Sequence, residues 1–220
     1  MNALIRTAAA AVLLFGALAA NAKPASSPTP QQRQAAQKLA GISVRMLDLS
    51  RLFRYNSSED SWYKQFQAIM TAEEFRCFTT KMGTPQGFRA YKMDEALDYV
   101  QRRSPQELQQ DFALLTPQTL QALSRLMSAW EDGITHNNND RYIQEMDWLQ
   151  QNPRLFNAVG RFMESAQHHD LRQLLLSFAF DTAPVEDGAR SIERYRLWSL
   201  QECRISIEEL RARARGGSVK

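Results

Sequence analysis

The feature that most restricts the fold of this chain is a helix-initiating pair of residues that recurs along the sequence. A hydroxyl or amide side chain stands directly before proline at Thr29–Pro30, Thr84–Pro85, Ser104–Pro105, Thr116–Pro117 and Asn152–Pro153. In the first turn of a helix, proline lacks only an N–H that has no intrahelical partner, and the side chain before it accepts a hydrogen bond from an exposed backbone N–H. Each pair therefore predicts the start of a helix. The pairs are unequally spaced, which argues against a solenoid of fixed repeat length.

The segments between these starts also have helical periodicity. Ser104 with Glu107, and Thr71 with Glu74, have the spacing of a capping box. Apolar residues recur every three or four positions, and no segment alternates with a period of two for long enough to predict a strand. The sequence therefore predicts an all-α fold, with a single compact bundle of about eight to ten helices over residues 30–220.

The first and last predicted helices are long. The first carries an apolar stripe of about three heptads. The members of this stripe are Ala35, Leu39, Ile42, Met46, Leu49 and Phe53. Either a coiled-coil dimer seam or a core-facing helix explains it. The last helix is predicted from about Ala189 to Arg215, after a loop at residues 181–188, and Gly83 and Gly133 are expected just past helix ends.

The N-terminus has the three parts of a secretory signal peptide. A short polar stretch with Arg6 precedes the uncharged run Ala8–Ala20, and small residues follow it at Ala20–Ala22. The uncharged run is shorter than the roughly 20 residues that a spanning helix needs. We therefore predict a signal peptide at residues 1–22 and a flexible tether at residues 23–29. The remaining protein is expected to be periplasmic or secreted, without stable membrane insertion.

Composition narrows the class of partner. The chain is 44% hydrophobic and 23% charged, as is typical of globular proteins. Its 27 lysines and arginines are interspersed with 24 aspartates and glutamates, giving a net charge of +3. This mixed pattern is not the basic footprint of a nucleic-acid-binding surface. We expect no nucleic-acid partner.

The chain has two cysteines, Cys77 and Cys203. Export would place them in a compartment where disulfides persist, and two cysteines allow one intramolecular pairing. We predict a disulfide between Cys77 and Cys203. The alternative is a pair of buried thiols, because Cys203 lies on the apolar stripe of the last helix and Cys77 is flanked by aromatic residues.

Candidate catalytic or metal-binding residues are sparse. Glu164 and His168 would lie one turn apart on a continuous helix, a spacing that suits two ligands of zinc or a similar ion. Asp170, or His136 with Asp140, would then complete the site through folding. The alternative interpretation is a polar break between two helices, with Asp170 capping the second. No catalytic constellation or cofactor-binding motif is recognised in the sequence, so no cofactor is expected.

Two short segments, Thr71–Phe75 and Lys81–Gly87, resemble a helical hairpin of a group of exported bacterial proteins of uncharacterised function. In that group an acidic helix start leads to an aromatic helix and then to a Thr-Pro-x-Gly turn. The resemblance implies an α-helical, periplasmic protein, and it supplies no catalytic residues. The two cysteines and the long C-terminal part of this chain depart from the group.

We interpret the chain as a non-enzymatic protein that binds another exported or envelope protein, in an assembly, adaptor or chaperone-like role. Apolar stripes suited to helix contacts are abundant, and a homodimer is compatible with them. Two alternatives stay open: a helical hydrolase or metal-dependent enzyme that uses Glu164 and His168, and a carrier of a small apolar ligand. The lining of such a carrier would include Phe156, Met163, Phe178 and Trp198.

Overall fold

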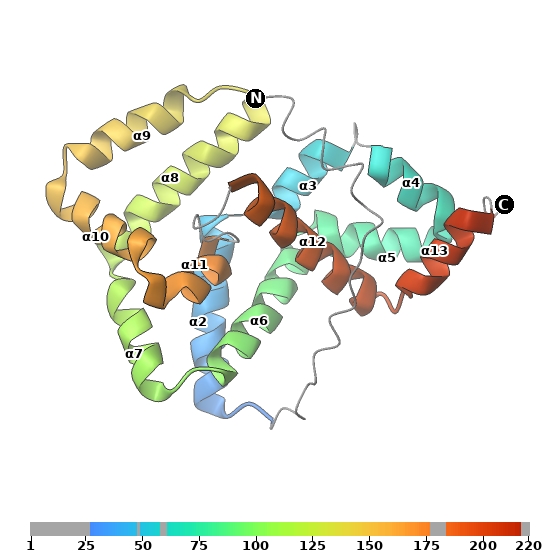
Figure 1. Cartoon of the computed structure of the whole chain (residues 1–220), viewed down its shortest axis with the longest axis horizontal. Helices are drawn as coiled ribbons and strands as arrows, with labels where there is room; N and C mark the ends of the chain where they lie inside the picture. Colours follow the sequence, from blue (N-terminus) through green and yellow to red (C-terminus); the bar gives the residue numbers. More distant parts are fainter. Residues whose placement is uncertain (1–26, 48, 58–60, 177–183, 217–220) are drawn as a thin grey trace.

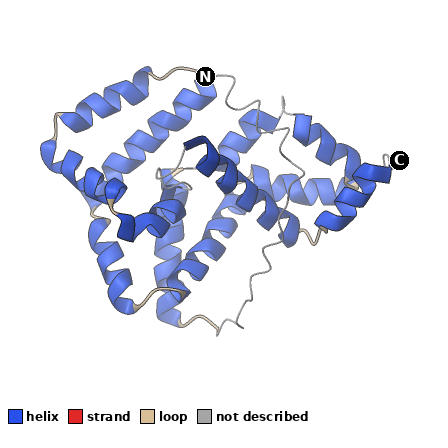
Figure 2. Ribbon diagram, in the orientation of Figure 1, coloured by secondary structure: helices blue, strands red, loops and turns tan. Residues whose placement is uncertain are grey.

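The computed structural model describes residues 27–47, 49–57, 61–176 and 184–216. Within these ranges the chain forms twelve α-helices and one 3-10 helix and no strand (Figure 2). The helices are α2 (Pro30–Met46), α3 (Leu49–Ser57), α4 (Ser61–Ile69), α5 (Ala72–Gly83), α6 (Pro85–Gln101), α7 (Pro105–Leu114), α8 (Pro117–His136), α9 (Asp140–Gln150), α10 (Pro153–Glu164), the 3-10 helix η2 (Ala166–His168), α11 (His169–Leu176), α12 (Pro184–Glu202) and α13 (Ile207–Gly216). The all-α prediction is confirmed, with more helices than expected. The predicted signal peptide and residues 23–26 of the predicted tether lie outside the described residues.

The predicted helix starts are confirmed at the hydroxyl–proline pairs. The side chains of Thr84, Ser104 and Thr116 accept hydrogen bonds from N–H groups three residues further on, at 3.1, 3.2 and 3.1 Å. Both predicted capping boxes form. The helix α10 also begins at the expected proline, but Asn152 does not cap it, because its side-chain amide donates to the carbonyl oxygen of Trp148 at 2.6 Å.

The prediction of one unbroken helix through Phe53 was wrong. The helix α2 ends at Met46, and Leu47 is extended, with φ −151° and ψ 126°. Leu47 is itself buried, and in a straight helix it would point about 100° away from Met46. The stripe members buried in the core of the chain are Leu39, Ile42, Met46, Leu49 and Phe53. This burial agrees with a core-facing helix and not with a coiled-coil seam.

The predicted single C-terminal helix was also wrong, because the chain breaks between α12 and α13. Arg204 lies in the left-handed region with φ 56°, and the N–H of Ile205 donates to the carbonyl oxygen of Leu200 at 2.9 Å. These features form a Schellman motif, which ends a helix. The side chain of Ser206 then accepts a hydrogen bond from the first turn of α13.

Two further boundaries differ from the prediction. Gly133 lies inside α8, which ends at His136 and is followed by left-handed Asn137 with φ 52°. Gly83 is the last residue of α5 and does not follow it. The helix α12 begins at Pro184, within the segment expected to be a loop.

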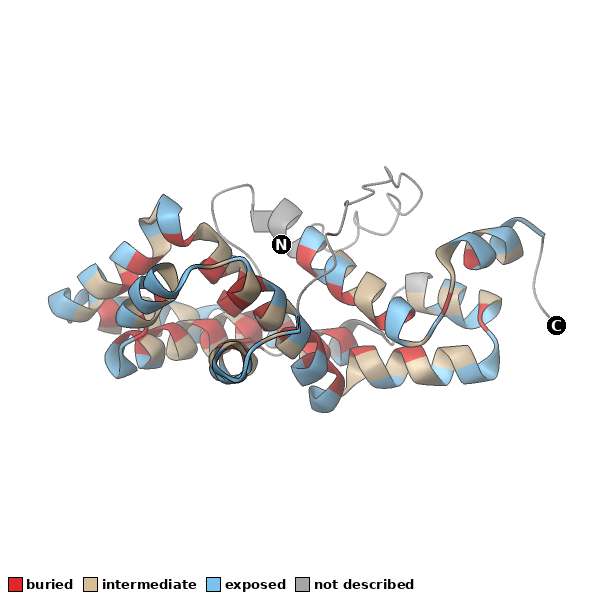
Figure 3. Cartoon of the chain, turned by 90° about the horizontal axis from the view of Figure 1, so that it is seen from below, coloured by how far each residue is buried: buried red, intermediate tan, exposed pale blue. Residues whose placement is uncertain are grey.

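The helices pack around a central pair, α2 and α6, on which α11 also lies (Figure 1). The helices α8, α9 and α10 form one end of the molecule, and α4, α5 and α13 form the other. Buried residues face the contacts between helices, and the outer faces of the end helices are exposed (Figure 3). No helix in the described ranges is both long enough and apolar enough to cross a membrane.

Candidate functional site

The two cysteines form the predicted disulfide. Cys77 lies on α5 and Cys203 directly follows α12, and their Cα atoms are 5.9 Å apart. The bond joins residues separated by 126 positions, and it fastens the end of α12 to α5. The alternative of two buried thiols therefore does not apply.

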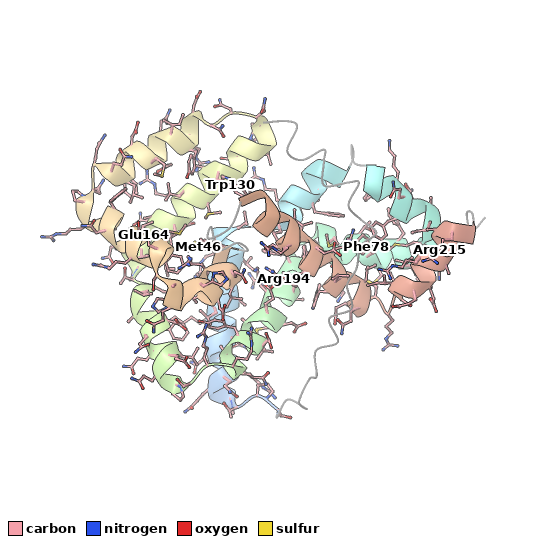
Figure 4. The ribbon with its side chains drawn as sticks, in the orientation of Figure 1. Met46, Phe78, Trp130, Glu164, Arg194 and Arg215 are labelled. Atoms are coloured by element: carbon pink, nitrogen blue, oxygen red, sulfur yellow. A yellow bond between two sulfur atoms is a disulfide. The ribbon has the colours of Figure 1, made fainter. Side chains whose placement is uncertain are left out.

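Glu164 and His168 are not on one continuous helix. Glu164 is the last residue of α10 and is exposed (Figure 4), whereas His168 is buried in η2 after the extended residue Ser165. The chain thus has the polar break that was the alternative interpretation, and Asp170 lies in the first turn of α11. Among the described residues, no group of three or more His, Cys, Asp or Glu side chains is placed to hold a metal ion. Metal binding by Glu164 and His168 stays a prediction, and the continuous helix that would have placed them one turn apart is not formed.

His168 belongs instead to a buried polar network. Its Nδ1 lies 2.8 Å from Oδ1 of Asp111 on α7, and the hydroxyl of Tyr99 on α6 donates to the other carboxylate oxygen. Asp111 and His168 are both buried. Burial and the hydrogen bond to Asp111 raise the pKa of Tyr99 above its ordinary value, because the neutral phenol is favoured there. The network joins α6, α7 and η2.

A second buried network surrounds Lys92 on α6. The ammonium of Lys92, which is 1% exposed, donates to the carbonyl oxygen of Leu174 at 2.9 Å and to Glu95 at 2.7 Å. Burial lowers the pKa of Lys92, although Glu95 opposes this effect. The hydroxyl of Tyr91 also donates to Glu95. Leu174 is in the last turn of α11, where carbonyl oxygens lack intrahelical donors and the helix dipole favours a positive charge. The ammonium of Lys92 supplies both the donor and the charge.

Arg172 plays the same role for another helix. It is 1% exposed, and its guanidinium donates to the carbonyl oxygens of Phe162, at 3.0 Å, and of Ser165. The Phe162 carbonyl lies in the last turn of α10, where carbonyls lack an intrahelical donor, and the Ser165 carbonyl directly follows that helix and also accepts from the N–H of His168 at 3.1 Å. Both buried cations are therefore explained by helix ends in the interior.

A cleft of about 210 Å³ lies between the two polar networks. Residues of α6, α11 and α12, and one residue directly after α6, line it: Glu95, Asp98, Tyr99, Arg102, Asp170, Gln173, Leu174 and Arg194. Figure 4 shows Arg194 near the middle of the molecule, on α12.

Each charged residue of this cleft is already engaged within the chain. Glu95 binds Lys92 as described, Asp98 pairs with Arg102 at 2.7 Å, and Asp170 pairs with Arg103 at 2.9 Å. The guanidinium of Arg194 donates to a serine hydroxyl on its own helix and lies 3.8 Å from Glu95. The Arg103–Asp170 and Arg194–Glu95 contacts connect separate elements, and the other contacts lie within one helix or directly after it. Because its charges are engaged in this way, the cleft favours a structural role over a catalytic one.

Lys92 and Asp111 were not predicted from the sequence to be buried charged residues. Both interrupt apolar stripes: Lys92 follows Phe88 by one turn, and Asp111 precedes Leu115 by one turn. A charge at such a position signals a buried partner, because an uncompensated buried charge is costly. The signal marks the residue but does not identify its partner.

Large apolar side chains are exposed on three helices. The exposed fraction is 55% for Ile143 on α9, 44% for Phe156 on α10 and 47% for Ile192 on α12. Of the other residues proposed to line a carrier cavity, Met163 and Trp198 are half-buried against the core. Phe178 lies outside the described residues.

Comparison of the chain with protein-family models, with curated proteins and with solved structures gives no match. The resemblance of the segments at residues 71–75 and 81–87 to exported hairpin proteins therefore stays a prediction.

Proposed function

We propose that this chain is an exported protein that acts by binding another exported or envelope protein. The observation that carries the proposal is the exposure of Ile143, Phe156 and Ile192 on three different helices. Single exposed apolar residues are common on monomers. Here they are the largest apolar side chains left uncovered in the described part of the chain, whereas the charges in the cleft are used internally.

The disulfide supports the export part of the proposal. Disulfides persist in the periplasm and outside the cell, and they are rare in reducing compartments. The signal-peptide pattern at residues 1–22 points to the same compartments.

The enzyme and carrier alternatives have less support. The hydrolase or metal-dependent alternative used Glu164 and His168, which occupy different elements, and Nδ1 of His168 is bound to Asp111. The carrier alternative used Phe156 as a lining residue, and this ring faces solvent.

Site-specific photo-cross-linking in intact cells tests the proposal. A photoreactive residue at position 143, 156 or 192 should give an adduct with a different protein, identified by mass spectrometry. The same residue at Arg33, which is exposed on α2, is the matched control and should not give that adduct. Recovery of the chain only without adduct, or only linked to a second copy of itself, would contradict binding to another protein.

A further inference from the structure

Four exposed charges on α9 and α10 share one spacing. Asp140 and Asp147 lie on α9, Arg154 and Arg161 lie on α10, and each is seven residues from the next. Residues seven apart lie on one face of a helix, about 10 Å apart along its axis. One helix therefore presents two carboxylates and the next presents two guanidiniums at the same separation.

These four side chains are not used within the described part of the chain. All four are exposed, and none of their side chains makes an ion pair or hydrogen bond there. Other charges nearby are engaged: Arg125 pairs with Glu145 at 2.7 Å, and Arg141 pairs with Asp132. Other exposed charges in the described part of the chain, such as Arg33, Arg89 and Glu164, also lack such a contact, so the shared spacing of these four charges distinguishes them, and not exposure alone.

An exposed apolar residue lies between the two aspartates of α9. Ile143 is 55% exposed, and it follows Asp140 by three residues and precedes Asp147 by four, so the three share one face. On α10 the position with the same spacing between the arginines is Asn157, which is exposed and short. The face of α9 therefore matches the face of α10 in charge and in the size of its central residue.

We propose that two copies of the chain associate by pairing α9 of each copy with α10 of the other about a two-fold axis. Such an axis makes both copies use the same patch, as in most homodimers. Each pairing places two carboxylates against two guanidiniums, with Ile143 between them. Figure 1 places α9 and α10 together at one end of the molecule, so a second copy can reach both helices. This inference does not rest on binding to another protein, but a second copy would cover Ile143 and so compete with another partner at that residue.

The pairing is small, so the dimer should be weak. The helices α9 and α10 have 11 and 12 residues, which makes each contact about 16–18 Å long. Two such contacts bury roughly 1,000 Å² in total, near the lower end of specific interfaces. We expect a dissociation constant on the order of 10–100 µM at low salt. It should rise with ionic strength, because salt screens exposed ion pairs.

Sedimentation velocity of the full chain with its disulfide intact, from about 1 to 500 µM, tests the pairing. Reversing α9 with Asp140→Lys and Asp147→Lys, or reversing α10 with Arg154→Glu and Arg161→Glu, should each weaken the dimer about tenfold or more. An equimolar mixture of the two double variants should dimerise again. In the mixed dimer the lysines of one copy face the glutamates of the other, and the second pairing is unchanged.

The matched control is Arg33→Glu with Arg89→Glu, which changes net charge as much as the α10 reversal but on α2 and α6. This control should dimerise like the wild type, and circular dichroism should show all variants folded. A wild-type chain that stays monomeric throughout the concentration range would overturn the proposal. So would reversed variants that dimerise unchanged, or a mixture that remains monomeric.

Discussion

Removal of the disulfide should cost a large part of the stability of this protein. The perturbation is the double substitution Cys77→Ala and Cys203→Ala. The bond closes a loop of 126 residues, for which loss of chain entropy in the unfolded state predicts a stabilisation of about 5 kcal/mol at 25 °C. Both residues are only half-buried, so the lost side-chain contacts add little. For a domain of this size, 5 kcal/mol corresponds to a fall in Tm of about 10–20 °C.

Thermal unfolding followed by circular dichroism at 222 nm measures this effect, with and without a reductant. The wild-type chain in reductant should unfold near the temperature of the double variant, and the variant itself should not respond to reductant. A double variant whose Tm falls by less than about 3 °C would refute the reasoning, because the loop would then contribute under 2 kcal/mol.

Four other substitutions test the packing and electrostatics. Gly87→Ala should destabilise the fold by about 2–3 kcal/mol in urea denaturation, because a Cβ there would lie 2.0 Å from a backbone carbonyl oxygen of α5. Gly160→Ala, where a Cβ meets nothing within 4 Å, should instead stabilise the fold by up to about 1 kcal/mol, and the opposite order would contradict the packing of α6. The hydrogen bond from Arg213 lowers the pKa of Glu74, so this carboxylate stabilises the fold above its unfolded pKa near 4.5 and loses that effect as pH falls. Glu74→Gln should therefore flatten the fall in Tm between about pH 5 and pH 3, and a curve parallel to that of the wild type would contradict the ion pair. Lys92→Met should destabilise the fold by about 2–4 kcal/mol, because it removes the cation at the end of α11, and an unchanged urea midpoint would show that this contact is dispensable.

Helix starts could be predicted from the sequence because their signals are local. A hydroxyl before proline and a glutamate three residues later act within one turn, as at Ser104. The break before α13 also has a local signal, which the single-helix prediction overlooked. Ser206 and Glu209 have the spacing of a capping box, and the buried residues Ile205 and Leu210 flank it as a hydrophobic staple.

Other features depend on contacts between distant parts of the chain. Leu47 leaves the helix to enter the core, and neither proline nor glycine marks this break. Lys92 donates to the carbonyl oxygen of Leu174, 82 residues away, and Asp111 binds His168, 57 residues away. The disulfide spans a still longer distance and was nevertheless predictable, because two cysteines allow one pairing.

The candidate interface on α9 and α10 likewise combines a signal that is local in the sequence with information that depends on the fold. The sequence contains the seven-residue spacing of Asp140, Asp147, Arg154 and Arg161. Folding decides whether each charge has a partner inside the chain, and that information comes from the arrangement of the helices. Periodicity alone does not separate these residues from Glu145, which is bound to Arg125.

Intact-mass spectrometry of the chain from separated cell fractions tests whether the protein is exported with its disulfide formed. We expect the envelope or secreted fraction to contain a chain that begins at Lys23. Its mass should be lower by two hydrogen atoms than that of the reduced chain. A chain recovered from the cytosol with Met1 retained and both thiols reduced would contradict export of a disulfide-bonded protein.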